Sequence, residues 1–492
     1  MATSHSGVGT VSRTRTVSRT AGASRERAGR PGARRPGRRG RMFGLAAVAL
    51  AAATTVAACG STGLPAPGTA AGSTVSGAAA AGSADGCAAG ATDVTFWGWS
   101  AGYNLAVNEF NKTHPDICVQ LENAGATTAE YVKLNDALTA KSGTPDVAQI
   151  EYFELPSFEI THSLVDLSQY GVTSSKSDEA SAAWAQVTQG SAQYAMPVDL
   201  GPMALYYNEK EFSTYNLAVP TTWAQFATEA DQLHAANSKD AITNFDPEST
   251  QDVLALMQQY GAFPFTYTGG DTIGINFTGA AETAFADFWQ GLIDKHEVTT
   301  AADFSPTQWS NFDSGVNASR LSPAWGPVGM QLSIKQTIGD WRAAPLPQAT
   351  AGQSLAGNWG GSSLAVIAGS PHAKQAAEFV QWFGGSADSW KILSGPVAGA
   401  YPAYLPLLNS DAFQNTTLPI SGTAKFNTVF AAAAKDLVDP QWPPIMTAAL
   451  TQWTSTFAGV TKGSETLAQA FSAYQQQLVN YAKAQGFTVT GS

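Results

Sequence analysis

Positive charge is scarce after residue 58 of this 492-residue chain. Of the 27 Lys and Arg residues, 11 precede residue 59, whereas only one of the 38 acidic residues does. The remaining chain has 16 basic and 37 acidic residues, a net charge of −21, and no Lys/Arg cluster. Nucleic acids and anionic membrane surfaces bind through basic patches, so we expect neither as a partner. The acidic residues are dispersed, which is typical of a soluble surface.

Sequence motifs of several enzyme classes are also missing. There is no Gly-x-Ser-x-Gly motif, which disfavours an α/β-hydrolase, and no His-Glu-x-x-His motif, which disfavours a zinc protease. The histidines are scattered singly, and we expect no metal, no cofactor and no catalytic residue. No Gly-x-x-x-x-Gly-Lys-Ser/Thr loop occurs, so we expect any ATPase partner to be a separate chain.

Long apolar runs are missing too. The apolar stretch Met42–Val56 is shorter than the roughly 20 residues that span a bilayer. It follows an Arg-rich run over residues 30–41, which is the order of features in a signal peptide. We therefore expect residues 1–58 to be a signal peptide, with the export route left open.

The end of this segment indicates an anchor. The tetrapeptide Val56-Ala57-Ala58-Cys59 resembles the lipobox of bacterial lipoproteins. The resemblance implies that Cys59 carries a diacylglycerol, becomes the mature N-terminus and holds the protein on the outer face of the cytoplasmic membrane. The alternative is an ordinary signal peptide with a coincidental cysteine.

Only three cysteines are present. If Cys59 carries lipid, Cys87 and Cys118 remain as a pair in an oxidising compartment, where we expect a disulfide between them. Two buried free thiols are the alternative. Residues 59–92 are almost entirely Gly, Ala, Ser, Thr and Pro, which predicts a flexible tether.

Ordered structure is expected from Asp93 onward, in an alternation of strands and helices. The pattern predicts a strand over 94–99, a helix over 104–114, a strand over 117–121, a helix over 128–140 and a strand over 146–150. Such βαβ units build a parallel sheet covered on both faces. Ligands bind beyond the carboxyl ends of such strands, which is where Trp99 and Glu151 fall.

The rest of the chain is richer in helices. Thr222 and Gln225 form a predicted capping box in front of an amphipathic helix. Trp223 and Trp289 lie within helical apolar patterns, so we expect them in the core. Further helices are predicted over 280–295, 373–383, 425–437, 444–457 and 466–484, with a strand over 364–367.

Several segments occur in an order that is similar to the carbohydrate-binding branch of the extracellular solute-binding proteins of ATP-binding-cassette importers. The segments are Thr144–Tyr152 with Leu164–Leu167, Tyr194–Asp199 through Gly201-Pro202 to Leu205–Asn208, Pro220–Trp223, Pro323–Pro327 and Asn358–Val366. The resemblance implies an α/β fold of two lobes, of the type II periplasmic-binding-protein class, with the ligand in a cleft between them. One lobe would combine residues 93–201 and 358–412, and the other residues 202–357 and 413–492. Gly201-Pro202 and Gly357 would lie at the hinge, where glycine lets the backbone absorb a rotation; plain turn residues are the alternative.

A sugar site needs flat aromatic faces and a few well-placed polar groups. Trp325 and Trp359 lie outside helical patterns and in cleft-facing motifs of the family, and Glu151 and Asp199 follow apolar stretches, so that they can accept sugar hydroxyls. The alternative for each carboxylate is a helix cap or a surface salt bridge. The expected ligand-binding residues are Trp99, Asn104, Glu151, Tyr152, Asp199, Trp325, Trp359, Gly360 and Ser362. Arg320 and Arg342 are the only arginines after residue 58, and we expect each to pair with a neighbouring carboxylate.

The expected function is therefore that of a monomeric sugar-binding lipoprotein. It would deliver a mono- or oligosaccharide to permease subunits of an importer by closing its cleft. A secreted glycoside hydrolase is the main alternative. Glu151 and Glu154 are close in sequence, but their spacing alone does not place them on either side of a glycosidic bond. A sugar sensor or adhesin on the same scaffold is another, and the sugar itself is not readable from the sequence.

Overall fold

The computed structural model describes residues 87–491. The expected signal peptide, Cys59 and the expected tether up to residue 86 lie outside the described residues. Cys87, the first described residue, forms a disulfide with Cys118, and their Cα atoms are 5.3 Å apart. Within residues 87–491, no helix has the length and apolar character needed to cross a bilayer.

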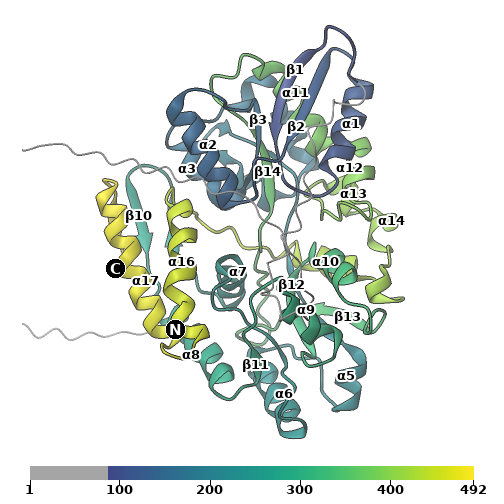
Figure 1. Ribbon diagram of the computed structural model, residues 1–492, viewed down its shortest axis with the longest axis vertical. Coiled ribbons are helices and arrows are strands. Elements are labelled where there is room, and N and C mark those ends of the chain that lie inside the picture. The colour runs from purple at the N-terminus through teal and green to yellow at the C-terminus, as the bar shows by residue number, and fades with distance from the viewer. Residues whose placement is uncertain (1–86, 492) are drawn as a thin grey trace, which may run out of the picture. The chain divides into compact units, whose positions relative to one another are not determined.

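The first lobe is built on a five-stranded sheet in the order β2-β1-β3-β14-β6 (Figure 1). Its strands are β1 (Thr92–Trp97), β2 (Ile117–Glu122), β3 (Val147–Glu151), β6 (Met196–Pro197) and β14 (Ser362–Val366). The sheet is buried on both faces, because Val147 belongs to one core whereas Ala148 and Ile150 belong to the other. This alternation follows from the two-residue period of a strand.

The sheet is not parallel throughout, contrary to the expectation from the sequence. β1 pairs in parallel with β2 and β3, but β14 runs antiparallel to β3, with Ser362 opposite Glu151. The reason is the path of the chain, because β14 starts directly after a crossover at the edge where β3 ends. The carboxyl end of β3 and the amino end of β14 therefore meet at one edge of the sheet.

Helices cover both faces of this sheet. One core contains phenylalanines from β1, from α1 (Tyr103–Thr113) and from α11 (Ala373–Gly385), together with α12 (Ala387–Leu393). Phe379 packs against Phe96 and Phe110, with ring centroids 5.4 Å and 5.1 Å away. On the other face, α2 (Thr128–Ala140) buries Tyr131 and Leu134.

The second lobe holds a three-stranded antiparallel sheet in the order β12-β7-β13. Its strands are β7 (Met203–Asn208), β12 (Ser319–Pro323) and β13 (Trp341–Pro345). The predicted capping box of Thr222 and Gln225 is present at the start of α6 (Trp223–Ala236). Trp223 and Trp289 are 2% and 0% exposed, so both are core residues, as predicted.

The remaining elements connect or cover these two sheets. The helices are α3 (Leu155–Glu159), α4 (Ser181–Gln186), α5 (Glu209–Thr214), α7 (Thr250–Tyr260), α8 (Ala280–Asp294), α9 (Pro306–Asp313), α10 (Gly326–Ser333), α13 (Leu405–Leu408), α14 (Asp411–Gln414), α15 (Phe426–Ala433), α16 (Met446–Thr461) and α17 (Leu467–Ala484). The 3₁₀ segments are η1 (Tyr152–Glu154), η2 (Leu167–Tyr170), η3 (Val172–Asp178) and η4 (Pro419–Ser421). The short strands are β4 (Thr188–Gln189), β5 (Ala192–Gln193), β8 (Thr243–Asn244), β9 (Phe265–Thr266), β10 (Thr272–Ile275), β11 (Val298–Thr299) and β15 (Thr488–Thr490).

Three chain segments run side by side where the lobes join. Pro202 and Asn358 form an antiparallel bridge, and the Trp359 backbone N–H donates to the Gly201 carbonyl at 2.9 Å. Ala356 forms a parallel bridge with Leu437. This third strand-like segment explains why α15 ends at Ala433 rather than at the expected residue 437.

Gly201 and Gly357, the two glycines expected at the hinge, lie very close to the backbone of neighbouring segments. Neither Gly201 nor Gly357 has a positive φ. A Cβ on Gly201 would lie 1.9 Å from the Trp359 carbonyl oxygen, and one on Gly357 would lie 2.1 Å from that of Ala255. Each position therefore needs glycine because a side chain would not fit, and the expected role of these glycines in a hinge rotation stays a prediction.

Candidate functional site

A cleft of about 640 Å³ lies between the two lobes. The first lobe contributes Trp99, Ser100, Ala101, Tyr103, Thr127, Thr128, Gln149, Glu151, Asp199, Ser362, Val397, Ala398 and Ala400. The second lobe contributes Ser249, Thr250, Gln251, Phe304, Trp325, Val328, Gly329, Leu332, Leu450 and Thr454, and the crossover contributes Trp359, Gly360 and Gly361. The cleft thus lies at the carboxyl end of β3, where the topology predicts a ligand site.

Three aromatic rings form one wall of the cleft. Trp325 and Trp359 pack edge to face with centroids 5.5 Å apart, and the Trp325 indole N–H donates to the Trp359 carbonyl at 3.1 Å. Phe304 lies nearly parallel to Trp325, with centroids 6.3 Å apart. Trp359 is only 4% exposed, whereas Phe304 is 50% exposed. A ligand in the cleft can therefore reach the rings of Phe304 and Trp325, whereas buried Trp359 packs against both rings and holds them in place.

Trp99 contributes an aromatic ring from the first lobe. It follows β1, and its backbone N–H donates to the side-chain oxygen of Gln149 at 3.1 Å. Its ring meets Tyr131 edge to face, with centroids 6.0 Å apart. The cleft therefore has indole rings on both of its sides.

Glu151 is the last residue of β3 and is 7% exposed. The Tyr131 hydroxyl donates to its Oε2 at 3.0 Å. Burial, together with the nearby charges of Asp199 and Glu154, raises the pKa of Glu151 to about 8. Glu151 occupies the N-cap position of η1, but its side chain makes no capping hydrogen bond. It forms no ion pair among the described residues, so the salt-bridge alternative is wrong.

Asp199 lies beside Glu151 across the start of β14. Its Oδ1 accepts from the Ser362 backbone N–H at 2.7 Å and from the Ser362 hydroxyl at 2.6 Å. Burial raises its pKa, and the bonds from Ser362 oppose that rise. Gly360 and Gly361, with φ of 75° and 92°, turn the chain between the tryptophan wall and this serine.

Two expected ligand-binding residues lie outside the cleft lining. Asn104 is exposed on the outer side of α1. Tyr152 is 2% exposed, and its hydroxyl donates to the Asp199 backbone carbonyl at 2.9 Å. η1 begins directly after Glu151, and the Tyr152 side chain is buried there. Tyr152 therefore holds the backbone at Asp199 through its hydroxyl group and does not face the cleft.

Sequence reasoning did not find Phe304. This residue has a φ of +59° and a half-exposed ring, and an aromatic residue in this conformation is a local strain that is found mainly at functional sites. Its sequence neighbourhood, Ala302-Asp303-Phe304-Ser305, carries no motif, so no sequence signal distinguished it. Gln149 was missed as well, because it lies inside a buried strand and looks like a core position.

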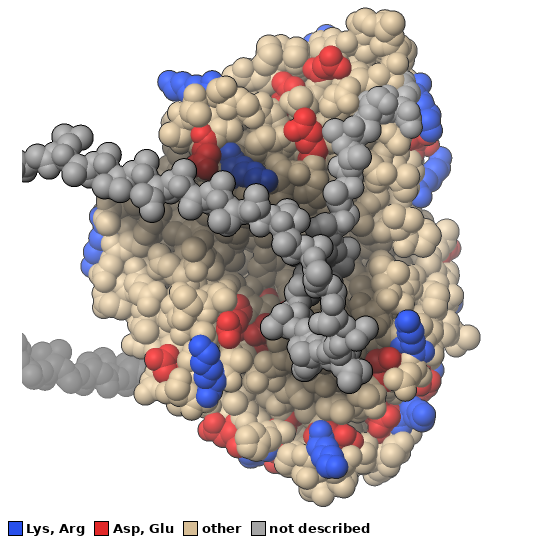
Figure 2. Space-filling view, in the orientation of Figure 1, with Lys and Arg blue, Asp and Glu red and all other residues tan. Residues whose placement is uncertain are grey.

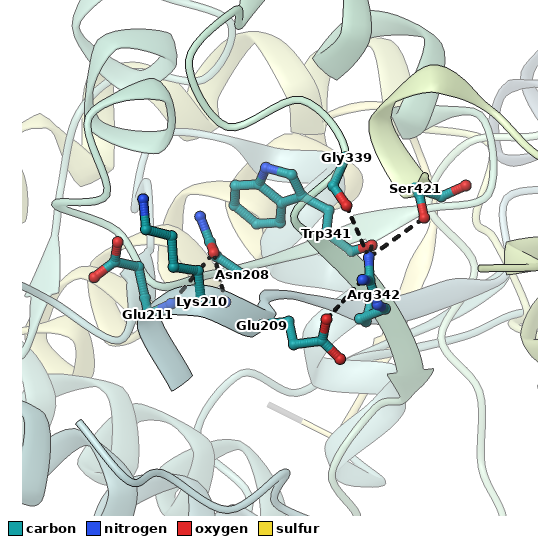
Figure 3. A network of polar contacts seen from close by, with 8 residues as sticks. All are labelled: Asn208, Glu209, Lys210, Glu211, Gly339, Trp341, Arg342 and Ser421. Carbon is teal, nitrogen blue, oxygen red and sulfur yellow. Dashed lines mark hydrogen bonds and ion pairs between the residues drawn. The ribbon is translucent and has the colours of Figure 1, made fainter. Parts of the chain in front are cut away.

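Neither arginine supplies a charge to the cleft. Arg342 forms an ion pair with Glu209 at 2.6 Å and donates to the carbonyls of Gly339 and Ser421 (Figure 3), so its expected pairing is confirmed. Arg320 is 3% exposed, and its guanidinium lies 4.6 Å from the Trp309 ring centroid. No ion pair to Arg320 occurs within residues 87–491, which corrects our expectation; it stacks on aromatic rings behind Phe304.

The cleft is acidic and lacks basic side chains. Among the residues that line it, Glu151 and Asp199 are ionisable carboxyl groups, and none is Lys, Arg or His. On the face of the molecule that Figure 2 shows, Lys and Arg side chains are scattered singly and form no patch. The site can thus donate and accept hydrogen bonds and stack against a flat ligand, but it has no cation to neutralise an anionic one.

Comparisons with known proteins agree on one family. The family described as bacterial extracellular solute-binding protein matches residues 97–388, which is more than half of the chain. A binding protein of an ABC transporter from B. animalis subsp. lactis Bl-04, solved with β-1,6-galactobiose, is 30% identical, with a TM-score of 0.72, over 81% of this chain and 100% of that one. The galacto-N-biose-/lacto-N-biose I-binding protein of Bifidobacterium longum is 27% identical with the same TM-score, over 82% and 99%. The lactose-binding protein of Rhizobium radiobacter is 25% identical over 60% of this chain and 70% of its own length.

Proposed function

The chain belongs to the bacterial extracellular solute-binding proteins, and on that premise we propose that it binds an uncharged carbohydrate in the cleft. It would work outside the cytoplasm and deliver the sugar to a membrane permease that is driven by a separate ATPase chain. Anchoring through a lipid on Cys59 and a monomeric state are parts of the same proposal. Two relatives that are 27 to 30% identical were solved with β-1,6-galactobiose and with lacto-N-biose, which supports a sugar as the ligand.

One observation carries the proposal: indole and phenyl rings and buried carboxyl groups line the same cleft, and no basic residue is among its lining residues. Sugar rings present C–H patches that stack on aromatic faces, and hydroxyls that bond to carboxyl groups. An anionic sugar would meet Glu151 and Asp199 without a compensating cation, which is unfavourable in a buried site. The proposal is therefore limited to uncharged sugars.

Sugar binding would be coupled to closure of the cleft. The lobes are joined by three adjacent segments near Gly201, Gly357 and Leu437. A ligand that contacts both lobes stabilises the closed arrangement by the difference between its affinities for the closed and open forms. The permease would then recognise the closed form.

Glycoside hydrolysis is less well supported. The two carboxylates that are close in sequence, Glu151 and Glu154, do not share the cleft, because Glu154 is 0% exposed and accepts a hydrogen bond from Thr447. Titration calorimetry against uncharged mono- and oligosaccharides, followed by product analysis, tests the proposal. We expect at least one sugar to bind with one-to-one stoichiometry and to be recovered intact. Cleavage of the bound sugar, or binding of none, would contradict it.

A further inference from the structure

The cleft is closed at one end by a contact between α2 and α16. Thr127 and Thr128, at the start of α2, line the cleft opposite Leu450 and Thr454 of α16. The two helices contact each other, and both lie on the left of the view in Figure 1. Thr127, Thr128 and Leu450 are partly buried and Thr454 is exposed, so a ligand that extended along the cleft toward this end would meet the contact between the two helices.

The other end is closed by a loop of the first lobe. Gly399, with a φ of +61°, approaches α10 so closely that a Cβ on it would lie 2.4 Å from a methyl group of Val328. The loop is held from behind, because a Cβ on Gly102 would lie 2.6 Å from the Ala398 side chain. Both α10 and α12, which precedes the loop, lie on the right of the view in Figure 1.

The space between the two ends is limited. The crossover residues Trp359 and Gly360 form the base of the cleft, so a ligand has one open side. At the packing density of protein interiors, a cleft of about 640 Å³ holds roughly two or three pyranose rings. A fourth ring in line with the others along the cleft would need to displace Val328 from Gly399, or α2 from α16.

We propose that the cleft selects short oligosaccharides of two or three rings, and that the contact between Val328 and Gly399 sets this upper limit. The inference rests on the proposed function, because it assumes that the ligand is a sugar. The limit is steric: a longer chain would hold the lobes apart and lose the contacts that closure adds. Near the contact between Val328 and Gly399, Val397 and Leu332 are 57% and 76% exposed. This end of the cleft is therefore thin, and a smaller side chain at Val328 would open it to solvent.

Two size series test the limit on the full-length folded protein. The probes are β-1,6-linked galacto-oligosaccharides and α-1,4-linked gluco-oligosaccharides of two to six rings, titrated by calorimetry. In a series that binds, we expect affinity to be highest at two or three rings and to fall roughly tenfold or more at five and six. Equal affinity of the hexasaccharide and the trisaccharide would overturn the limit. Binding of neither series, nor of any other uncharged sugar, would overturn the proposed function and this inference with it.

A variant tests which end sets the limit. Val328→Ala removes the methyl groups that face Gly399, and we expect the ratio of hexasaccharide to disaccharide affinity to rise roughly tenfold. Val219→Ala, at a 39% exposed valine outside the cleft, is the matched control and should leave the ratio unchanged. Denaturation curves identify a variant that fails to fold, in which case Val397→Ala measures the same ratio. An unchanged ratio in a folded Val328 or Val397 variant would assign the limit to the α2–α16 end and overturn the role of Val328.

Discussion

Replacing Glu151 with Gln should change how the stability of the protein depends on pH. Burial raises the pKa of Glu151 from 4.5 to about 8, so the folded state keeps this carboxyl protonated where the unfolded state has released the proton. A raised carboxyl pKa contributes full stability below about pH 4.5, and this contribution is lost as pH rises toward 8. The change in pKa corresponds to about 5 kcal/mol at most, at about 1.36 kcal/mol per unit.

The glutamine of the variant has no proton to lose. The free energy of unfolding of Glu151→Gln, relative to wild type, should therefore increase by up to about 4 kcal/mol between pH 5 and pH 8. Denaturant unfolding at several pH values in this range measures the difference. Asp199, Glu154 and Glu130 also have raised pKa values because they are buried, but they are present in both proteins and largely cancel in the comparison.

The control is Glu378→Gln, at an exposed position on α11. Its stability relative to wild type should stay constant across the same pH range. A constant difference for Glu151→Gln as well would refute the reasoning, because it would show that Glu151 is ionised in the folded protein at pH 7. The cleft would then present a buried negative charge to its ligand.

The hinge, the disulfide and the cleft lining each give one further prediction. Gly201→Ala should lower the free energy of unfolding by about 3 kcal/mol or more, because the new Cβ would lie 1.9 Å from the Trp359 carbonyl oxygen; denaturant unfolding measures this, and an unaltered midpoint would contradict the close approach at the hinge. Replacing Cys87 and Cys118, 31 residues apart, with Ser should lower the free energy of unfolding by roughly 3 to 4 kcal/mol, because the unfolded chain gains entropy. Thiol labelling of the unfolded, unreduced wild type that finds both of these cysteines free would argue against the bond. Asn104→Ala should leave sugar affinity unchanged in calorimetry, because Asn104 is exposed outside the cleft. A clear loss of affinity would show that Asn104 contributes to sugar binding.

Local patterns in the sequence predicted much of the first lobe. The alternation from β1 to β3 follows from the periodicity of apolar residues, which is encoded within a few residues of each element. The antiparallel direction of β14 and the early end of α15 could not be predicted in this way, because both depend on the segments that cross between lobes. Pairing of Ala356 with Leu437 joins residues far apart in the chain, and no local pattern records it.

The candidate site was predictable where a residue type and a strand end coincide. Glu151, Asp199 and Trp325 all line the cleft, because motifs or strand ends placed them there. Phe304 was not predictable, since its position depends on a strained loop stacked over buried Arg320. Asn104 does not line the cleft, because it lies in the first turn of α1 on the exposed side of that helix.

The central claim is that a sugar stacks on the aromatic wall of the cleft. The affinity of Trp325→Ala for the best sugar of the wild-type titration tests it most directly. Truncating a central aromatic contact typically costs about 2 kcal/mol or more, which corresponds to roughly thirtyfold weaker binding. Trp382→Ala, at a partly buried tryptophan that packs on Phe110 outside the cleft, is the matched control and should bind as wild type does. Equal affinities of wild type and Trp325→Ala would contradict the account, because the sugar would then be held elsewhere.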